Sequence, residues 1–167
     1  MKENYAQSLK QILKYEGGKV DAPRDPGGRT AYGITQNTYD SWRKKQNLPT
    51  ADVFKISQDE VAAIYKQEYW DKICGDDLPS GVDFAIFDYA VNSGVYKASK
   101  TLQAVVGVDQ DGVIGQQTIQ AAKTYVAMTV TNKRLAFMKT LSIWSTFGNG
   151  WSARIANVKN QILALTK

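Results

Sequence analysis

The chain has 167 residues, a formal charge of +5 and a sequence pI near 9.2, and it contains one cysteine and no histidine. This composition excludes catalysis by Ser-His or Cys-His pairs, the usual zinc sites and an intrachain disulfide. Carboxylate chemistry remains for a hydrolase, which favours glycosidase-type catalysis without a metal or other cofactor.

The basic charge suits an anionic polymer such as peptidoglycan or nucleic acid. It is spread along the chain, and its only run of three, Arg43-Lys44-Lys45, fits a solvated helix end better than a nucleic-acid patch. No stretch approaches about 18 apolar residues, and the N-terminus lacks an apolar signal region. We therefore expect no nucleic-acid partner, no stable membrane insertion, and synthesis in the cytoplasm without a Sec signal.

The first predicted element is a helix over residues 3–17. Its buried stripe consists of Tyr5, Leu9, Ile12 and Leu13. Glu16 projects from the same stripe, and Gly17-Gly18 indicates the helix end. In the last helical turn, desolvation and the negative end of the helix dipole would both favour protonated Glu16, as a general acid requires. The alternative is a solvated acid on a fraying helix end.

A turn-rich stretch over residues 18–34 follows, and it has room for a short β-hairpin but not for a large sheet. Asp25 lies nine residues after Glu16 and is followed by Pro26-Gly27-Gly28, which is strong turn chemistry. Asp25 is therefore either a second functional carboxylate or a cap of this turn.

The remaining pattern is helical. Thr35 to Lys45 predicts one helix, and the capping box from Ser57 to Glu60 begins another. An apolar helix is expected near 82–93, and the next helix ends at Gly107. A turn-rich loop follows from Asp109 to Gly115, and the last predicted helices cover 116–129, 131–146 and 151–165. Without a repeat or a flexible linker, the two halves are expected to share one core.

Several motifs together resemble one family. They are Glu16-Gly17-Gly18, Asp25-Pro26-Gly27-Gly28 with Thr30, Gly33-Ile34-Thr35, the segment from Asp88 to Gly94, Leu102-Gln103, the segment from Asp111 to Thr118, and Gly150-Trp151 with Arg154. This set resembles glycoside hydrolase family 108, small bacterial and phage N-acetylmuramidases that carry a C-terminal predicted peptidoglycan-binding half. Lys19, Ala31 and Gln116 depart from the family's usual residues. None of these departures removes the catalytic glutamate.

The resemblance implies a mainly α, lysozyme-like fold with the short hairpin near residues 18–34. It implies a catalytic segment over 1–78 and a helical peptidoglycan-binding-like segment over 79–167, packed as one compact unit. The expected activity is that of a muramidase, which cleaves the β-1,4 bond between N-acetylmuramic acid and N-acetylglucosamine with Glu16 as the acid. A lytic transglycosylase and a non-catalytic peptidoglycan-binding module are the alternatives.

Asp25 would orient water or stabilise the oxocarbenium character of the transition state. Four further residues are candidates for substrate binding. Thr30 and Thr35 can hold water or a sugar hydroxyl, or serve in turns and caps. Tyr32 can stack on a sugar ring or pack in the core. Asn92 can bind an N-acetyl group or end a helix.

The expected partner is the glycan strand of peptidoglycan, and the protein is expected to be a monomer. Without a Sec signal, it would reach the wall from the cytoplasm through a holin or another route of release. The sequence leaves open whether the biological role is phage lysis or wall remodelling for secretion. It also leaves open whether the reaction inverts or retains the anomeric configuration, because that depends on the separation of the carboxyl groups.

Overall fold

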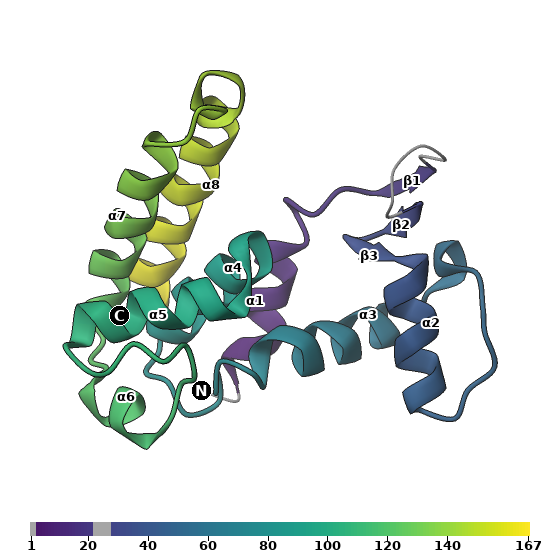
Figure 1. The fold of residues 1–167 in the computed structure, drawn as a ribbon, viewed down its shortest axis with the longest axis horizontal. Coiled ribbons are helices and arrows are strands. Elements are labelled where there is room, and N and C mark those ends of the chain that lie inside the picture. The colour runs from purple at the N-terminus through teal and green to yellow at the C-terminus, as the bar shows by residue number, and fades with distance from the viewer. Residues whose placement is uncertain (1–2, 22–27) are drawn as a thin grey trace. The chain divides into compact units, whose positions relative to one another are not determined.

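The computed structural model describes residues 3–21 and 28–167. Within these ranges the fold is mainly α, with one small antiparallel sheet (Figure 1). This confirms the predicted mainly α, lysozyme-like class and the short hairpin. Within the described residues, no helix combines the length and the apolar character that crossing a membrane requires.

The chain divides into two compact units. Leu9–Lys66 forms the inserted unit, and Met1–Ser8 together with Gln67–Lys167 forms the helical unit. The boundaries fall within the first helix and directly after Lys66. The predicted division after residue 78 separates functions rather than compact units, and it stays a prediction.

The inserted unit contains the sheet and several short helices. In chain order its elements are the second half of α1 (Asn4–Ile12), β1 (Lys19–Asp21), β2 (Arg29–Ala31), β3 (Ile34–Thr35), α2 (Gln36–Lys45), the 3-10 helix η1 (Val53–Lys55) and α3 (Gln58–Tyr65). The three strands are antiparallel in the order β1-β2-β3, and Val20 pairs with Thr30 across the first two. Buried apolar side chains from each helix and from β2 and β3 fill its interior.

Two side-chain caps explain where the helices of this unit begin. The Thr35 hydroxyl accepts a hydrogen bond from the Thr38 backbone N–H, as an N-cap residue does. Ser57 and Glu60 form the predicted capping box, in which each side chain accepts a hydrogen bond from the other residue's backbone N–H. Both helices therefore begin where the sequence predicts them.

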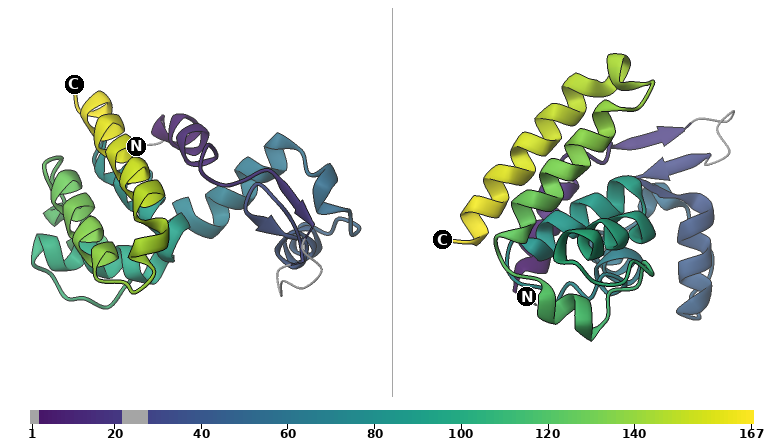
Figure 2. Two further views of the ribbon diagram at one scale, coloured as in Figure 1. Left: turned by 90° about the horizontal axis from the view of Figure 1, so that it is seen from above. Right: turned by 60° about the vertical axis from the view of Figure 1, so that its left-hand side comes forward.

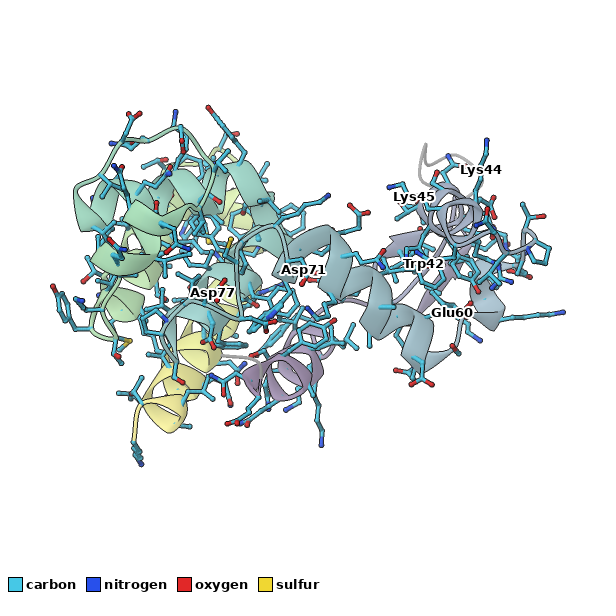
Figure 3. All side chains as sticks on the ribbon, turned by 90° about the horizontal axis from the view of Figure 1, so that it is seen from below. Trp42, Lys44, Lys45, Glu60, Asp71 and Asp77 are labelled. Atoms are coloured by element: carbon cyan, nitrogen blue, oxygen red, sulfur yellow. The ribbon has the colours of Figure 1, made fainter. Side chains whose placement is uncertain are left out.

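The C-terminal end of α2 carries the basic run predicted to be solvated. Lys44 and Lys45 are exposed and point away from the body of this unit, whereas Trp42 is buried (Figure 3). Arg43 differs from its two neighbours, because it turns back and pairs with Glu60 at 2.5 Å. The run is therefore partly a solvated helix end and partly a structural ion pair.

The helical unit is built from the first residues of α1 and all elements after Lys66. These are the π-helix η2 (Lys66–Trp70), α4 (Val82–Ser93), α5 (Val95–Val106), α6 (Gln116–Ala121), α7 (Val126–Lys139) and α8 (Trp144–Leu165). The two longest helices, α7 and α8, lie side by side in every view (Figures 1 and 2). The apolar helix α4 packs against α5, α7 and α8 and is the centre of this unit.

Aromatic rings and one buried ion pair hold this unit together. Tyr5 of α1 packs on Trp70 and Phe87, with ring centroids 5.3 and 5.8 Å away. Asp88 of α4 is buried and pairs with two arginines. Arg134 donates to one of its carboxylate oxygens at 2.6 Å, and Arg154 donates to the other at 3.0 Å. A single buried carboxylate thus pairs with two guanidinium groups.

Three of the predicted helices of this unit differ from those observed. The segments 116–129 and 131–146 are replaced by α6 and α7, because Ala122 adopts an extended backbone and ends α6. The last helix begins at Trp144 rather than near 151, although Gly148 follows early in it. A Cβ on that glycine would lie 2.7 Å from the Trp144 ring, so the glycine makes room for the indole within the helix.

Candidate active site

Glu16 lies just beyond the first helix. The α-helix ends at Ile12, where the Tyr15 N–H bonds to the Ile12 carbonyl at 2.9 Å and tightens the chain into a turn. The predicted helix over 3–17 therefore ends five residues too late, and the helix-dipole argument for protonated Glu16 does not apply. Glu16 is half-buried in a bend, and Gly17 and Gly18 lead from it into β1.

The glycine of the Gly-Ile-Thr motif forms the turn that Glu16 contacts. Ala31 pairs with Ile34, so Tyr32 and Gly33 are the two residues of a hairpin loop. Their φ angles, +52° and +74°, are both positive, as a type I′ turn requires. A Cβ on Gly33 would lie 3.2 Å from Glu16 Oε2 and 3.5 Å from Glu16 Cβ. The bare Cα at this position lets the glutamate side chain lie directly on the turn.

Tyr65 of α3 reaches the same turn from the other side of the hairpin loop. Its side chain is buried, and its hydroxyl donates a hydrogen bond of 2.8 Å to the Tyr32 carbonyl. The same oxygen would lie 2.9 Å from a Cβ on Gly33. The Tyr65 hydroxyl oxygen and Glu16 Oε2 therefore both lie close to the position that a Gly33 Cβ would occupy.

This arrangement combines a carboxyl group with a rigid backbone support. Glu16 comes from the bend that follows α1, Gly33 from the hairpin loop and Tyr65 from α3, so three segments meet at one place. The Glu16 side chain is half-buried rather than enclosed. A carboxyl group fixed in this way can transfer a proton to or from a bound molecule.

A hydrogen-bond network links α2 to α3, the helix that carries Tyr65. Tyr39 of α2 donates to Glu60 of α3 at 2.9 Å, and Arg43 donates to Tyr39 at 3.0 Å. Burial alone would raise the pKa of Glu60, but hydrogen bonds from Ser57 and Tyr39 and the charge of Arg43 lower it below its ordinary value. Burial and the neighbouring Glu60 carboxylate raise the pKa of Tyr39. Glu60 is thus ionised and holds α2 against α3.

Arg29 of the hairpin forms two ion pairs. Arg29 of β2 ion-pairs with Asp52 at 3.2 Å and with Asp21 of β1 at 3.9 Å. Its guanidinium group lies 4.0 Å from the centre of the Phe54 ring. These contacts attach the strands to the segment that includes η1. Within residues 3–21 and 28–167, no cluster of three or more acidic or cysteine side chains could hold a metal ion.

The predicted binding residues occupy different places. Thr30 is half-buried on β2, and its hydroxyl donates to the Gly28 carbonyl at 3.4 Å, whereas Thr35 caps α2. Tyr32 is half-buried in the hairpin loop. Asn92 is exposed near the end of α4, in the helical unit, and accepts a hydrogen bond from Arg134 at 3.0 Å. These contacts match the turn and cap alternatives for the threonines, and the proposed substrate contacts stay predictions.

The structure thus brings together Glu16 and the Tyr32-Gly33 turn, and it adds Tyr65. Asp25 lies outside the described residues. Tyr65 is buried on α3 with Val61 and Ile64, where a tyrosine fits as a core residue. A buried tyrosine generally needs a partner for its hydroxyl group, and this was the one available signal of a second role.

Comparisons with known proteins identify one family and one similar solved structure. A family model described as glycosyl hydrolase 108 matches residues 9–94, a range that includes both Glu16 and Asn92. The solved structure of SagA from Brucella abortus is 42% identical in sequence, with a TM-score of 0.83. That match covers 100% of this chain and 98% of SagA. A search of curated proteins returned no match.

Proposed function

Because the chain belongs to the glycosyl hydrolase 108 family and is a glycoside hydrolase, we propose that it is an N-acetylmuramidase. In this proposal it hydrolyses the β-1,4 bond between N-acetylmuramic acid and N-acetylglucosamine in peptidoglycan. The lysozyme-like fold and the basic charge of +5 support an anionic wall polymer as the substrate.

One observation carries the choice of Glu16 as the general acid. Its carboxyl group lies against Gly33, where a Cβ would come within 3.2 Å of Oε2. Both residues belong to motifs of the family segment, and the turn gives the carboxyl group a fixed support. A positioned acid of this kind contributes about 10²–10⁴-fold to the rate of bond cleavage.

In the proposed reaction, Glu16 transfers its proton to the glycosidic oxygen as the bond to the anomeric carbon breaks. Asp25 either orients the attacking water or stabilises the positive charge that develops on the sugar ring. An inverting enzyme needs a carboxyl separation of about 6.5–9.5 Å, and a retaining enzyme needs about 5–5.5 Å. Tyr65 holds the Tyr32 carbonyl, and through this turn it positions Glu16.

The substrate contacts belong to the same proposal. Thr30 and Thr35 hold a water or a sugar hydroxyl, Tyr32 stacks on a sugar ring, and Asn92 binds an N-acetyl group. The proposed division of labour places catalysis in residues 1–78 and wall binding in 79–167. The enzyme acts as a monomer on glycan strands once it has reached the cell wall.

The test is mass spectrometry of the fragments that wild type and Glu16→Gln release from purified peptidoglycan. Wild type is expected to leave hydrated, reducing muramic acid ends, and the variant is expected to release none. Products with 1,6-anhydro ends would show a lytic transglycosylase instead. If neither protein released fragments from walls of several crosslink types, a binding module without catalysis would replace the proposal.

Lys19→Gln is the matched control for this experiment, because Lys19 is exposed on β1 in the same unit. It changes one charge near the glutamate without touching Gly33. We expect it to keep hydrolysis. Equal losses in Glu16→Gln and Lys19→Gln would mean that charge in this region, and not the acid, limits the reaction.

A further inference from the structure

The helical unit contains a cavity that the proposed glycosidase chemistry does not use. It has a volume of about 360 Å³ and is lined by residues of α4, α5 and α7 together with Gln110. Tyr89 of α4 and Phe137 of α7 form aromatic parts of its wall, and two alanines add small apolar surface. All of these residues lie in one compact unit, so the cavity belongs to that unit alone.

Three lysines line this cavity. Lys97 and Lys100 lie on α5, one helical turn apart, and Lys133 lies on α7. The Lys97 ammonium is 3.3 Å from the centre of the Phe137 ring, and the Lys100 ammonium is 3.4 Å from the Tyr96 hydroxyl oxygen. Within the part of the chain that the structure describes, none of the three has an acidic partner, and no acidic side chain lines the cavity.

The sequence around the cavity explains this excess of positive charge. Residues 112–167 contain seven lysines and arginines but no aspartate or glutamate. Neither α6, α7 nor α8 can therefore supply an anion to the lysines. Asp88, which precedes the cavity residue Tyr89 on α4, is already paired with Arg134 and Arg154. Asp111 accepts hydrogen bonds from Gln103 and from the Val113 N–H.

Lys97 also bears a cost of burial. Its side chain is half-buried, and burial lowers the pKa of its ammonium group. The cation–π contact with the Phe137 ring compensates for part of the lost hydration energy. A bound anion would supply the counter-charge that the chain itself does not place there, and it would interact with Lys100 and Lys133 at the same time.

We propose that this cavity binds the carboxylates of a short acidic peptide, of the kind that is attached to the glycan strand and forms its crosslinks. The choice of peptide rests on the proposed wall substrate. The three ammonium groups bind the carboxylates, and the aromatic and alanine surface takes up small apolar side chains. Thr101 and Gln110, which also line the cavity, provide hydrogen-bonding groups for the peptide backbone.

Carboxylates fit this site better than phosphates. Ammonium groups bind carboxylates and phosphates alike, so the apolar wall decides between them. A phosphodiester polymer would gain little from Phe137 and the alanines. A peptide with methyl groups and free carboxylates uses both the apolar wall and the charged rim.

The experiment titrates the full-length protein with a synthetic tetrapeptide that carries two free carboxylates and alanine side chains. Amide chemical shifts are followed by NMR, and the same peptide with both carboxyl groups amidated is the control ligand. The double variant Lys100→Gln with Lys133→Gln tests the site. Lys123→Gln with Lys159→Gln is the matched control, because it removes the same charge from residues of this unit that do not line the cavity.

We expect shifts at Tyr89, Thr101 and Phe137, and about tenfold weaker binding in the cavity variant, since two partly exposed ion pairs are lost. The control variant is expected to change the dissociation constant by less than about twofold, and the amidated peptide should not bind. Equal weakening in both variants, shifts confined to other surfaces, or no binding would overturn the proposal. The peptide has no glycosidic bond, so failure here leaves the muramidase proposal untouched, and that proposal fails only through the released fragments.

Discussion

Gly33→Ala tests whether the hairpin turn holds Glu16. The φ angle of +74° makes any L-residue with a side chain strained at this position, at a cost of about 1–2 kcal/mol. The new Cβ would also lie 2.9 Å from the buried Tyr65 hydroxyl, which must move and weaken its hydrogen bond to Tyr32, a loss of about 1 kcal/mol. The expected decrease in the free energy of unfolding is therefore roughly 2–3 kcal/mol.

The methyl group that Gly33→Ala introduces would also displace the Glu16 carboxyl group. It would meet Glu16 Oε2 at 3.2 Å and Cβ at 3.5 Å, so the carboxyl group must shift by a few tenths of an ångström or more. A misplacement of about 1 Å can cost about a hundredfold in rate, and we expect kcat to fall at least about tenfold in a fully folded sample. Urea unfolding measures the first effect, and release of reducing ends from peptidoglycan measures the second.

Gly107→Ala is the matched control. Gly107 has nearly the same φ, +76°, and a Cβ there would have no atom within 4 Å. The control should show the backbone cost of about 1–2 kcal/mol and unchanged kcat. If the two variants lost equal stability and Gly33→Ala kept the wild-type kcat, the turn would not support the acid, and the argument from close approach would be wrong.

Three further outcomes follow from contacts within each unit. Tyr65→Phe removes the donor to the Tyr32 carbonyl and should lower the unfolding free energy by about 1 kcal/mol in urea, whereas Tyr125→Phe, 76% exposed, should not. Asp88→Asn should cost about 3–5 kcal/mol, because Arg134 and Arg154 lose their buried counter-charge; a loss no larger than that of exposed Asp109→Asn would contradict this. The lowered pKa of Glu60 contributes stability that is present above pH 4.5, the ordinary pKa of the group, and is lost as the pH falls below it. The unfolding free energy of Glu60→Gln should therefore decrease less than that of wild type between about pH 6 and about pH 3.

Local signals predicted the helices that carry their own caps. The Thr35 cap and the Ser57–Glu60 capping box are bonds within four residues, so the sequence alone specifies them. Gly107 ends α5 in the left-handed conformation, which glycine adopts without strain. The start of α8, which has no side-chain cap, was predicted seven residues too late.

The site was predictable only in part, for a physical reason. Glu16 and Gly33 belong to short motifs, and their pairing in space is consistent with the resemblance that those motifs carry. Tyr65 is 49 residues away from Glu16 in the sequence, and its place beside the turn depends on how α3 packs. No local pattern encodes such a contact. The end of α1 also escaped prediction, because the apolar stripe continues to Leu13 while the α-helical hydrogen bonding does not extend to Tyr15.

The position of Tyr5 constrains the order in which the molecule can fold during synthesis. Tyr5 packs on Trp70 and Phe87, and Asn4 donates hydrogen bonds to Ser80 and Asp83. The ribosome makes these two residues before Leu9–Lys66, whereas their partners emerge only after that segment. Leu9–Lys66 can gain structure while translation continues, whereas the helical unit is completed last and must close a loop across that segment. A fragment that begins after residue 78 would lack Tyr5 and Trp70, and a peptide carrying the start of α1 could be supplied in trans to restore only the first of them.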